Sequence, residues 1–204
     1  MTQLTIGPDG IARCSWGASS PEYEDYHDHE WGLPVGNDQR VFEKLCLEGF
    51  QAGLSWLTIL RKRESFRRAF AGFDPSVVAA FGPADVERLL QDSGIVRNRA
   101  KIEATISNAA ATIRLTEQGV SLGALLWRHE PRHNPVPKSL GDLPSSTPES
   151  KSLSVELRSQ GFRFVGPTTV YAAMQSLGVV NDHFAGCHFR RIAESARAGF
   201  KRPT

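Results

Sequence analysis

Two cysteines and two histidines near opposite ends of the chain form a possible set of metal ligands. Cys14 and His27 lie in an N-terminal stretch that we expect to be irregular, and His183 and Cys187 are spaced to share one side of a helical turn. Two thiolates and two imidazoles make a complete tetrahedral set for Zn²⁺. With four protein ligands the ion has no open position, so the sequence predicts one structural zinc that joins the two ends of the chain.

Spacing alone leaves this metal set open, because ligands so far apart in the sequence also meet this pattern by coincidence. His29 and His188 are rival ligands. Cys46 fits a hydrophobic core better, since it continues an apolar helical stripe. Three cysteines are too few for a disulfide scaffold.

Glu48 is a carboxylate on an otherwise apolar helix face. It follows Val41 by seven positions and Leu45 by three, which places all three side chains on one stripe. A carboxylate there needs donors or takes up a proton more readily. Glu48 is therefore either a buried residue satisfied by backbone amides or an arginine, or a hydrogen-bond acceptor for a ligand in a pocket.

Aromatic residues are concentrated on both sides of Glu48 in the sequence. They are Trp16, Tyr23, Tyr26, Trp31 and Trp56. Such residues often only fill a core. Together with one carboxylate they also suit a flat, electron-poor heterocycle, because aromatic faces attract a cationic ring and the carboxylate accepts an exocyclic amine proton.

The composition indicates one folded domain spanning residues 1–204. Hydrophobic residues make up 40% and charged residues 23% of the 204 residues, and no apolar run is long enough to span a bilayer. The first residues do not resemble a secretory signal, so we expect a cytoplasmic protein with no membrane partner. The net charge is only +2, but basic residues cluster in 61–63, 67–68, 97–101 and 190–202. These clusters are either solvated helix faces or part of a surface for a phosphate backbone.

Helical periodicity and capping residues dominate the chain, and the expected fold class is all-α. Helices are predicted over residues 38–49, 54–70, 83–91, 98–118, 147–159 and 167–177. Leu57, Leu60, Phe66 and Phe70 are the expected core residues of the second of these. A Pro- and Ser-rich loop spans 131–146, a short turn spans 161–166, and no strand pattern of convincing length is present.

Several segments together resemble the 3-methyladenine DNA glycosylase I family. They are Arg13-Cys14-Ser15-Trp16, Tyr26-His27-Asp28-His29-Glu30-Trp31-Gly32, Leu47-Glu48-Gly49-Phe50-Gln51-Ala52-Gly53-Leu54-Ser55-Trp56, Phe73-Asp74-Pro75 and Val180-Asn181-Asp182-His183. The resemblance covers about residues 13–187, which leaves 1–12 and 188–204 as terminal extensions.

The resemblance implies a helix–hairpin–helix fold with a zinc staple joining the N- and C-terminal segments, and double-stranded DNA containing alkylated bases as the partner of a monomeric enzyme. It assigns the metal to Cys14, His27, His183 and Cys187. It makes Glu48 the catalytic-site carboxylate that hydrogen-bonds the base, and it places five aromatic residues around that base. These are Tyr26 and Trp56 against the ring, with Trp16, Tyr23 and Trp31 nearby.

For DNA, the resemblance implies that Gly53 and Leu54 fill the gap left by a flipped nucleotide. The turn 161–166, ending at Gly166, and the helix after it would bind a backbone phosphate, with hydroxyl contacts from Thr168 and Thr169. The implied activity is hydrolysis of the N-glycosidic bond of 3-methyladenine in base excision repair.

No lysine lies between residues 161 and 187, and the only nearby acid, Asp182, adjoins the expected zinc ligand His183. These observations predict a monofunctional glycosylase without lyase activity. Two other classes remain: a zinc-stapled DNA-binding module without catalysis, and a zinc hydrolase, which needs an open coordination position.

Overall fold

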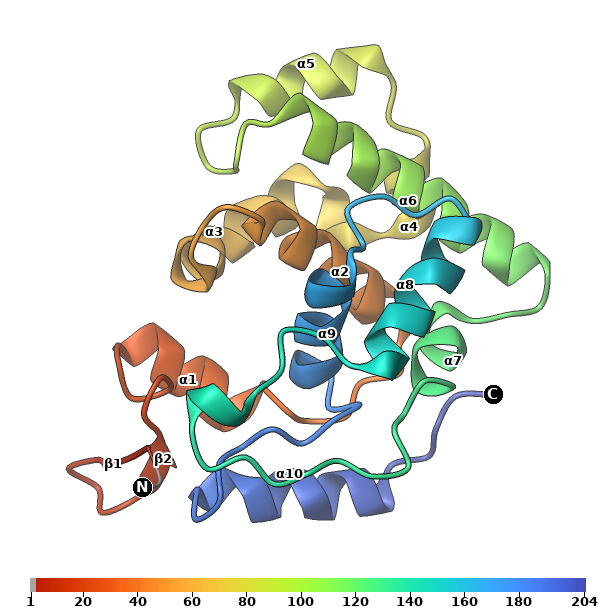
Figure 1. Ribbon diagram of the computed structural model, residues 1–204. Helices are drawn as coiled ribbons and strands as arrows, with labels where there is room; N and C mark the ends of the chain where they lie inside the picture. Colours follow the sequence, from red (N-terminus) through yellow and green to blue (C-terminus); the bar gives the residue numbers. More distant parts are fainter. Residues whose placement is uncertain (1–2) are drawn as a thin grey trace.

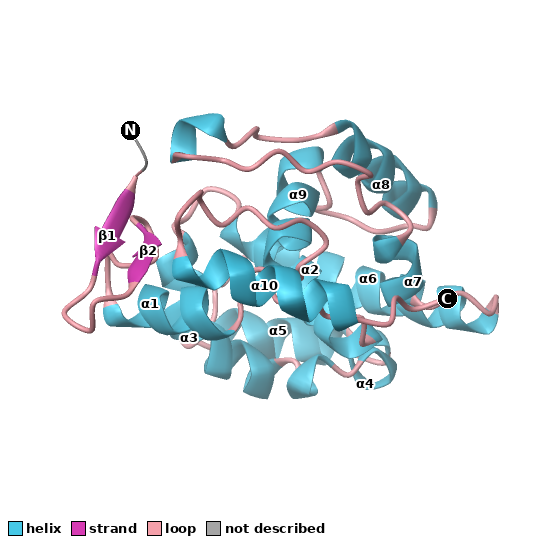
Figure 2. Ribbon diagram, turned by 90° about the horizontal axis from the view of Figure 1, so that it is seen from below, coloured by secondary structure: helices cyan, strands magenta, loops and turns pink. Residues whose placement is uncertain are grey.

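The protein is described by a computed structural model that covers residues 3–204. Within that range it is mostly helical, with ten α-helices and one small β-hairpin (Figures 1 and 2). The helices are α1 (Pro21–His29), α2 (Asp38–Gln51), α3 (Trp56–Ala69), α4 (Pro75–Ala79), α5 (Pro83–Gln91), α6 (Arg99–Glu117), α7 (Leu122–Trp127), α8 (Pro148–Ser159), α9 (Pro167–Ser176) and α10 (His188–Gly199). Short 3₁₀ turns lie at Ala71–Phe73 and Leu140–Asp142.

The N-terminal stretch is ordered secondary structure, so the expectation of an irregular segment was wrong. Strands β1 (Leu4–Ile6) and β2 (Ala12–Cys14) pair antiparallel, with Leu4 opposite Cys14. Helix α1 follows, with the Ser20 side chain accepting from the backbone amide of Tyr23 at its N-terminus. The all-α expectation therefore holds only as a mostly helical fold.

Helix α2 is the centre of the hydrophobic core. It packs against α3, α6, α7 and α9, and Figure 1 shows α2 and α9 between α4–α6 on one side and α10 on the other. Its stripe of Val41, Phe42, Leu45 and Cys46 is buried, as the sequence predicted. This stripe carries Glu48 into the interior.

Helix α3 begins two residues later than predicted. Ser55 is its N-cap, accepting from the Thr58 amide, and Leu54 lies in the exposed turn before it. Ile59 is fully buried, whereas Leu57 and Leu60 are only partly so. Phe66 and Phe70 are in the core as expected.

Helices α8 and α9 form an antiparallel pair joined by the predicted turn. The Thr147 hydroxyl caps α8 by accepting from the Ser150 amide, and Pro148 is its first residue. In the turn, Gly161 has a φ of +92°, a conformation that favours glycine. Gly166 is the N-cap of α9.

The segment 181–187 is not helical, contrary to the prediction for His183 and Cys187. It follows α9 as a loop and turn and leads into α10, which forms most of the expected C-terminal extension (Figure 1). Glu130 fixes the end of α10, because its carboxylate accepts from both Arg197 and Arg202. None of the helices described in residues 3–204 has the length and apolar character to cross a membrane.

Candidate metal and base-binding sites

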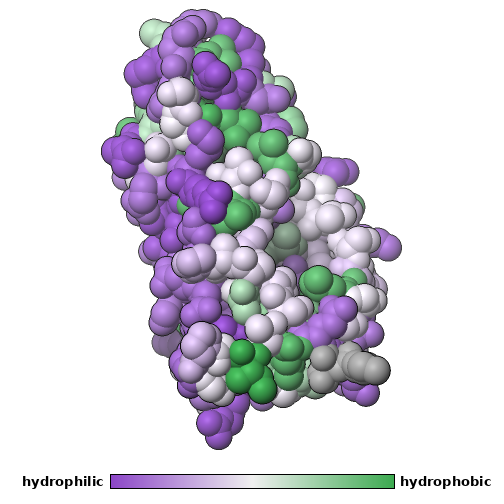
Figure 3. Space-filling view, turned by 90° about the vertical axis from the view of Figure 1, so that its left-hand side faces the viewer, coloured by the Kyte–Doolittle hydropathy of each residue, from purple (hydrophilic) through white to green (hydrophobic). Residues whose placement is uncertain are grey.

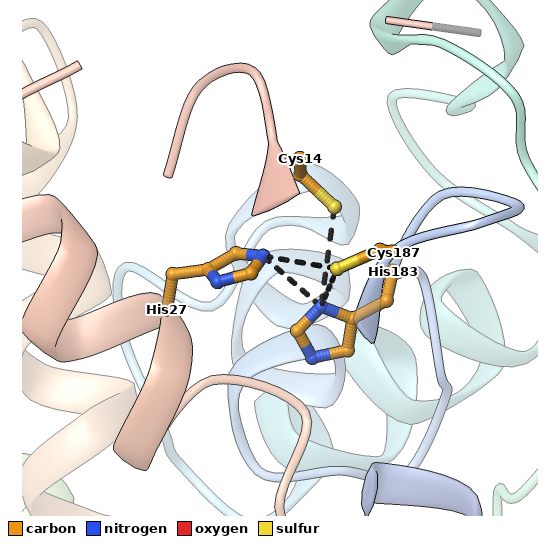
Figure 4. Close-up of side chains that lie close together, drawn as sticks. All are labelled: Cys14, His27, His183 and Cys187. Atoms are coloured by element: carbon orange, nitrogen blue, oxygen red, sulfur yellow. Dashed lines mark hydrogen bonds between the residues drawn. The ribbon is translucent and has the colours of Figure 1, made fainter. Parts of the chain in front are cut away.

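Cys14, His27, His183 and Cys187 converge in one buried group, although they come from β2, α1 and the 181–187 loop (Figure 4). Their ligand atoms all lie within 4.8 Å of one another. The Cys187 sulfur is 3.7 Å from His27 Nε2 and 3.7 Å from His183 Nδ1. The Cys14 sulfur is 3.9 Å from His183 Nδ1, and the two imidazole nitrogens are 3.2 Å apart.

These separations fit a single tetrahedral ion. Zinc–sulfur bonds of about 2.3 Å and zinc–nitrogen bonds of about 2.0–2.1 Å give ligand–ligand edges of roughly 3.3–3.8 Å. Burial of all four ligands also agrees with a closed site. The group therefore has the donor set and the geometry to hold a metal ion.

The far sides of both imidazoles are held by hydrogen bonds that leave the inward nitrogens free. His27 Nδ1 donates to Asp28 at 2.8 Å, and His183 Nε2 donates to the Trp31 carbonyl at 3.1 Å. Asp28 in turn accepts from Arg13. Such outer partners fix the tautomer of a metal-binding histidine and orient its ring.

Without an ion, the group favours one thiolate and one neutral imidazole, and the second thiol loses its proton when a metal binds. A hydrogen bond from Cys14, reinforced by the two imidazoles, lowers the pKa of the Cys187 thiol although burial opposes this. The hydrogen bond with Cys187, together with burial, raises the pKa of the Cys14 thiol. Burial lowers the pKa of His183, which favours the neutral imidazole that binds a metal.

The rival ligands lie elsewhere. His29 is on the surface, paired with Asp25. His188 is exposed at the start of α10, and Cys46 lies in the main core as predicted.

A second feature is a cavity of about 210 Å³ that contains all six side chains predicted for base binding. They are Glu48, Tyr26, Trp56, Trp16, Tyr23 and Trp31, and the cavity is completed by Gln51, Leu140, Leu143, Ala172 and Gln175. Figure 3 shows a hollow bordered by hydrophobic and weakly polar residues on the side of the molecule where α1 and α3 lie. The sequence thus identified the residues of one concave site.

Glu48 is buried, and its partner is a residue that the sequence analysis missed. Lys44, one helical turn earlier, places its ammonium 2.8 Å from the Glu48 carboxylate. The partner is thus neither a backbone amide nor an arginine, the two donors that a purely structural role for Glu48 had predicted. The i,i+4 spacing on the apolar stripe was the available sign, but lysines at such spacing usually reach solvent.

The metal group and the cavity share a wall. Trp16 lies edge-on to Trp31, with 4.8 Å between the ring centroids, and edge-on to His27 at 5.2 Å. Tyr26 precedes His27 on α1 and lies 5.4 Å from Trp56. The part of the cavity wall formed by Trp16, Tyr26 and Trp31 therefore belongs to the segment that carries Cys14 and His27.

Two side chains of the cavity wall, Trp56 and Gln175, carry hydrogen-bond donors with different partners. The indole N–H of Trp56 is the one buried side-chain donor within residues 3–204 that lacks a hydrogen-bond partner. Gln175, which sequence reasoning missed, donates to the buried carboxylate of Asp182. Asp182 also accepts from Tyr171 and Asn134, so it is engaged in holding side chains rather than free.

The residues predicted to contact DNA lie in the turn after α2 and at the start of α9. Gly53 has a φ of +85° and Leu54 is 43% exposed, in the turn after α2. Lys101 fixes this turn by donating to the carbonyls of Phe50 and Ala52. Helix α2 reaches the α8–α9 turn at Gly49, where a Cβ atom in place of the glycine hydrogen would lie 3.3 Å from Phe164.

Beyond that turn, the predicted phosphate contacts lie in the first turn of α9. Thr168 is exposed and Thr169 is partly buried.

This chain is similar in sequence to known proteins of one family. The family model described as methyladenine glycosylase matches residues 16–191. The DNA-3-methyladenine glycosylase 1 of Escherichia coli K12 is 47% identical over 180 residues, covering 87% of this chain and 96% of that protein. The Haemophilus influenzae DNA-3-methyladenine glycosylase is 47% identical over 178 residues, with 86% and 96% covered.

Solved structures agree. A crystal structure of 3-methyladenine DNA glycosylase I is similar with a TM-score of 0.83 at 47% identity, covering 86% of this chain and 98% of that one. A Staphylococcus aureus structure that addresses 3-methyladenine recognition gives a TM-score of 0.83 at 33% identity, with 87% and 96% covered. The chain belongs to the methyladenine glycosylase family.

Proposed function

We propose that this protein is a DNA glycosylase that hydrolyses the N-glycosidic bond of 3-methyladenine in alkylated DNA, as the first step of base excision repair. The observation that carries the proposal is the buried Glu48 carboxylate in a cavity walled by Tyr26, Trp56 and three other aromatic side chains. The relatives support it, since they are named for this activity.

The chemistry of the lesion fits such a cavity. Methylation at N3 makes the adenine cationic in DNA and weakens its bond to the sugar, so expulsion of the base needs little acid–base help. Aromatic faces attract the cationic ring, and Glu48 accepts a hydrogen bond from the exocyclic amine. A base without a matching donor leaves the carboxylate unpaired, which gives selectivity.

Access to the cavity requires the damaged nucleotide to leave the double helix. Leu54, exposed at the tip of its turn, is suited to fill the gap in the bent duplex. The α8–α9 unit acts as a helix–hairpin–helix motif, with the amides at the start of α9 and the hydroxyls of Thr168 and Thr169 on a backbone phosphate. Double-stranded DNA is then the partner of a monomeric enzyme.

The metal group holds one structural Zn²⁺. Four ligands leave the ion no open position, which argues against the zinc hydrolase interpretation. The ion supplies a cross-link, and the residues of this chain perform the recognition.

The enzyme is monofunctional. A lyase needs an amine that attacks the sugar, and the sequence has no lysine in 161–187. Lys44 is close to the base cavity, but its ammonium is committed to Glu48 and Tyr26. We therefore expect the abasic strand to remain intact.

The test is base release from methylated duplex DNA, with the freed base identified by chromatography. Wild type should release 3-methyladenine without strand cleavage or borohydride-trapped adduct. Glu48→Gln should slow release about 10- to 100-fold, the equivalent of a charge-assisted hydrogen bond of about 1.5–3 kcal/mol.

A matched control is available on the same helix. Glu43 is as buried as Glu48 but pairs with Arg67, outside the base cavity. Glu43→Gln should keep most of the activity. DNA binding by wild type without any base release would instead support the DNA-binding module.

A further inference from the structure

Lys44 is a buried cation that the proposed reaction does not use. Its side chain is about one-tenth exposed, and its ammonium contacts three groups. It lies 2.8 Å from Glu48 Oε1, donates to the Tyr26 hydroxyl at 2.7 Å, and lies 3.5 Å from the centroid of a Trp56 ring. Tyr26, Glu48 and Trp56 are the three residues assigned to the base itself.

Lys44 stands on the far side of the wall that the base would contact. It lines a second cavity of about 230 Å³, which shares Tyr26 and Trp56 with the base cavity. Glu48 lines only the base cavity. The ammonium therefore contacts Glu48 from the side of the second cavity and forms an ion pair with one carboxylate oxygen, Oε1.

We propose that Lys44 is a positioning residue that keeps Glu48 ionised and fixed, so that the second carboxylate oxygen accepts a hydrogen bond from the exocyclic amine of the base. This inference rests on the proposed function. Lys44 itself touches neither the base nor the sugar in this arrangement; it acts through Glu48.

The physical reason is the cost of a buried charge. A carboxylate removed from water and surrounded by aromatic rings is stable only with a nearby cation and hydrogen bonds, and otherwise takes up a proton at higher pH. Protonation matters here because a neutral carboxyl is a weaker acceptor for an amine. Burial lowers the pKa of Lys44, and the Glu48 carboxylate 2.8 Å away opposes that shift, so the carboxylate favours the charged ammonium.

The other charged groups near the pair already have partners. From α1 and its end, Glu30 pairs with Arg63 of α3, and His29 pairs with Asp25. On α2 and α3, Glu43 binds Arg67 and lies beside Arg40. The titratable hydroxyls facing the pair are those of Tyr23 and Tyr26, and α9 contributes only the uncharged Gln175, Ser176 and Leu177 with Ala172.

The experiment compares single-turnover release of 3-methyladenine from methylated duplex DNA by wild type, Lys44→Met and Lys44→Arg between pH 5.5 and 8.5. We expect the wild-type to Lys44→Met rate ratio to rise about tenfold from pH 8 to pH 5.5, as for a carboxyl group that loses a cationic neighbour. Lys44→Arg retains the charge, so its ratio should stay within about twofold across this range.

A double variant separates action through Glu48 from a direct role. In a Glu48→Gln background, adding Lys44→Met should change neither the rate nor its pH dependence, because there is no carboxylate left to position. Any pH dependence that comes from His29 persists in the Glu48→Gln background, so it is measured there and subtracted from the pH dependence of Lys44→Met. Thermal unfolding and metal content, measured at both ends of the pH range, check that each variant is folded. Lys44→Gln, which keeps a hydrogen-bond donor but no charge, replaces Lys44→Met if the latter unfolds.

The outcomes are distinct. A rate ratio that does not change with pH, or a Lys44→Met loss that persists in the Glu48→Gln background, overturns the positioning role and leaves the glycosylase activity standing. Absence of 3-methyladenine release by the wild type overturns the proposed function itself.

Discussion

Loss of the metal group should destabilise the protein, and the size of this effect depends on how far apart its ligands are in the sequence. Cys14 and His183 are 169 positions apart, so an ion between them closes a very long loop. The loop-closure entropy of such a cross-link corresponds to about 5 kcal/mol at 25 °C. For a chain of this length, each kcal/mol shifts the melting temperature by about 2–4 °C, so Cys187→Ala should lower it by about 10–20 °C.

The assay is calorimetric unfolding together with metal analysis of the purified protein. Wild type should contain one zinc ion per chain, and Cys187→Ala should lose the ion and the stability together. Cys46→Ala is the matched control, because Cys46 is a buried thiol in the main core and not a member of the metal group. A wild type purified without metal, or a Cys187→Ala variant that melts like the wild type, would refute the reasoning.

Two further predictions concern Leu54 and Glu130. Leu54→Ala should leave stability unchanged within about 0.5 kcal/mol, because the side chain is exposed, yet slow base release from duplex DNA about tenfold; equal rates on methylated duplex would contradict the wedge role. Burial raises the pKa of Glu130, but Arg202 and Arg197 outweigh it and the net shift is downward. The stability from Glu130 is thus fully present above its ordinary pKa and is lost as pH falls through the lowered value. Glu130→Gln should therefore show a smaller fall in melting temperature between pH 7 and pH 3 than wild type, at a cost of at most about 1 kcal/mol at neutral pH; parallel pH curves would count against this ion-pair cluster.

Local patterns predicted six of the ten helices in residues 3–204; α1, α4, α7 and α10 were missed, although Asp74 caps α4 and Ser121 caps α7. Helix α8 begins at Pro148 behind the Thr147 cap, and α6 begins after Asn98 and ends before Gly119, as expected. Helix α1 was missed because it buries little beyond Tyr26 and His27, so it has no apolar periodicity. Ser20 and Pro21 did give a cap and a first residue, and they were the available sign.

The site was predicted less evenly, for a physical reason. Residue type and helical phase pointed to Glu48, because a carboxylate on an apolar stripe is conspicuous in a sequence. The role of Lys44 depends on Tyr26 and Trp56 reaching it from two other helices, which no local pattern encodes. The role of Gln175 was equally hidden from the sequence, since its hydrogen bond to Asp182 depends on how the 181–187 loop packs against α9.

The order of residues along the N-terminal segment links the metal group to the walls of the base cavity. Metal ligands and cavity residues alternate there: Cys14 is followed by Trp16, Tyr26 by His27, and the carbonyl of Trp31 accepts from His183. Few residues of this segment lie in the main core: α1 has two buried residues, and it meets α2 and α3 through Tyr23, Tyr26 and ion pairs. A metal ion in this group would cross-link the segment to the 181–187 loop and so hold the aromatic walls against Glu48, which is positioned by α2. The base cavity thus lies between two parts of the fold, and a metal ion in the group would fix the distance between them.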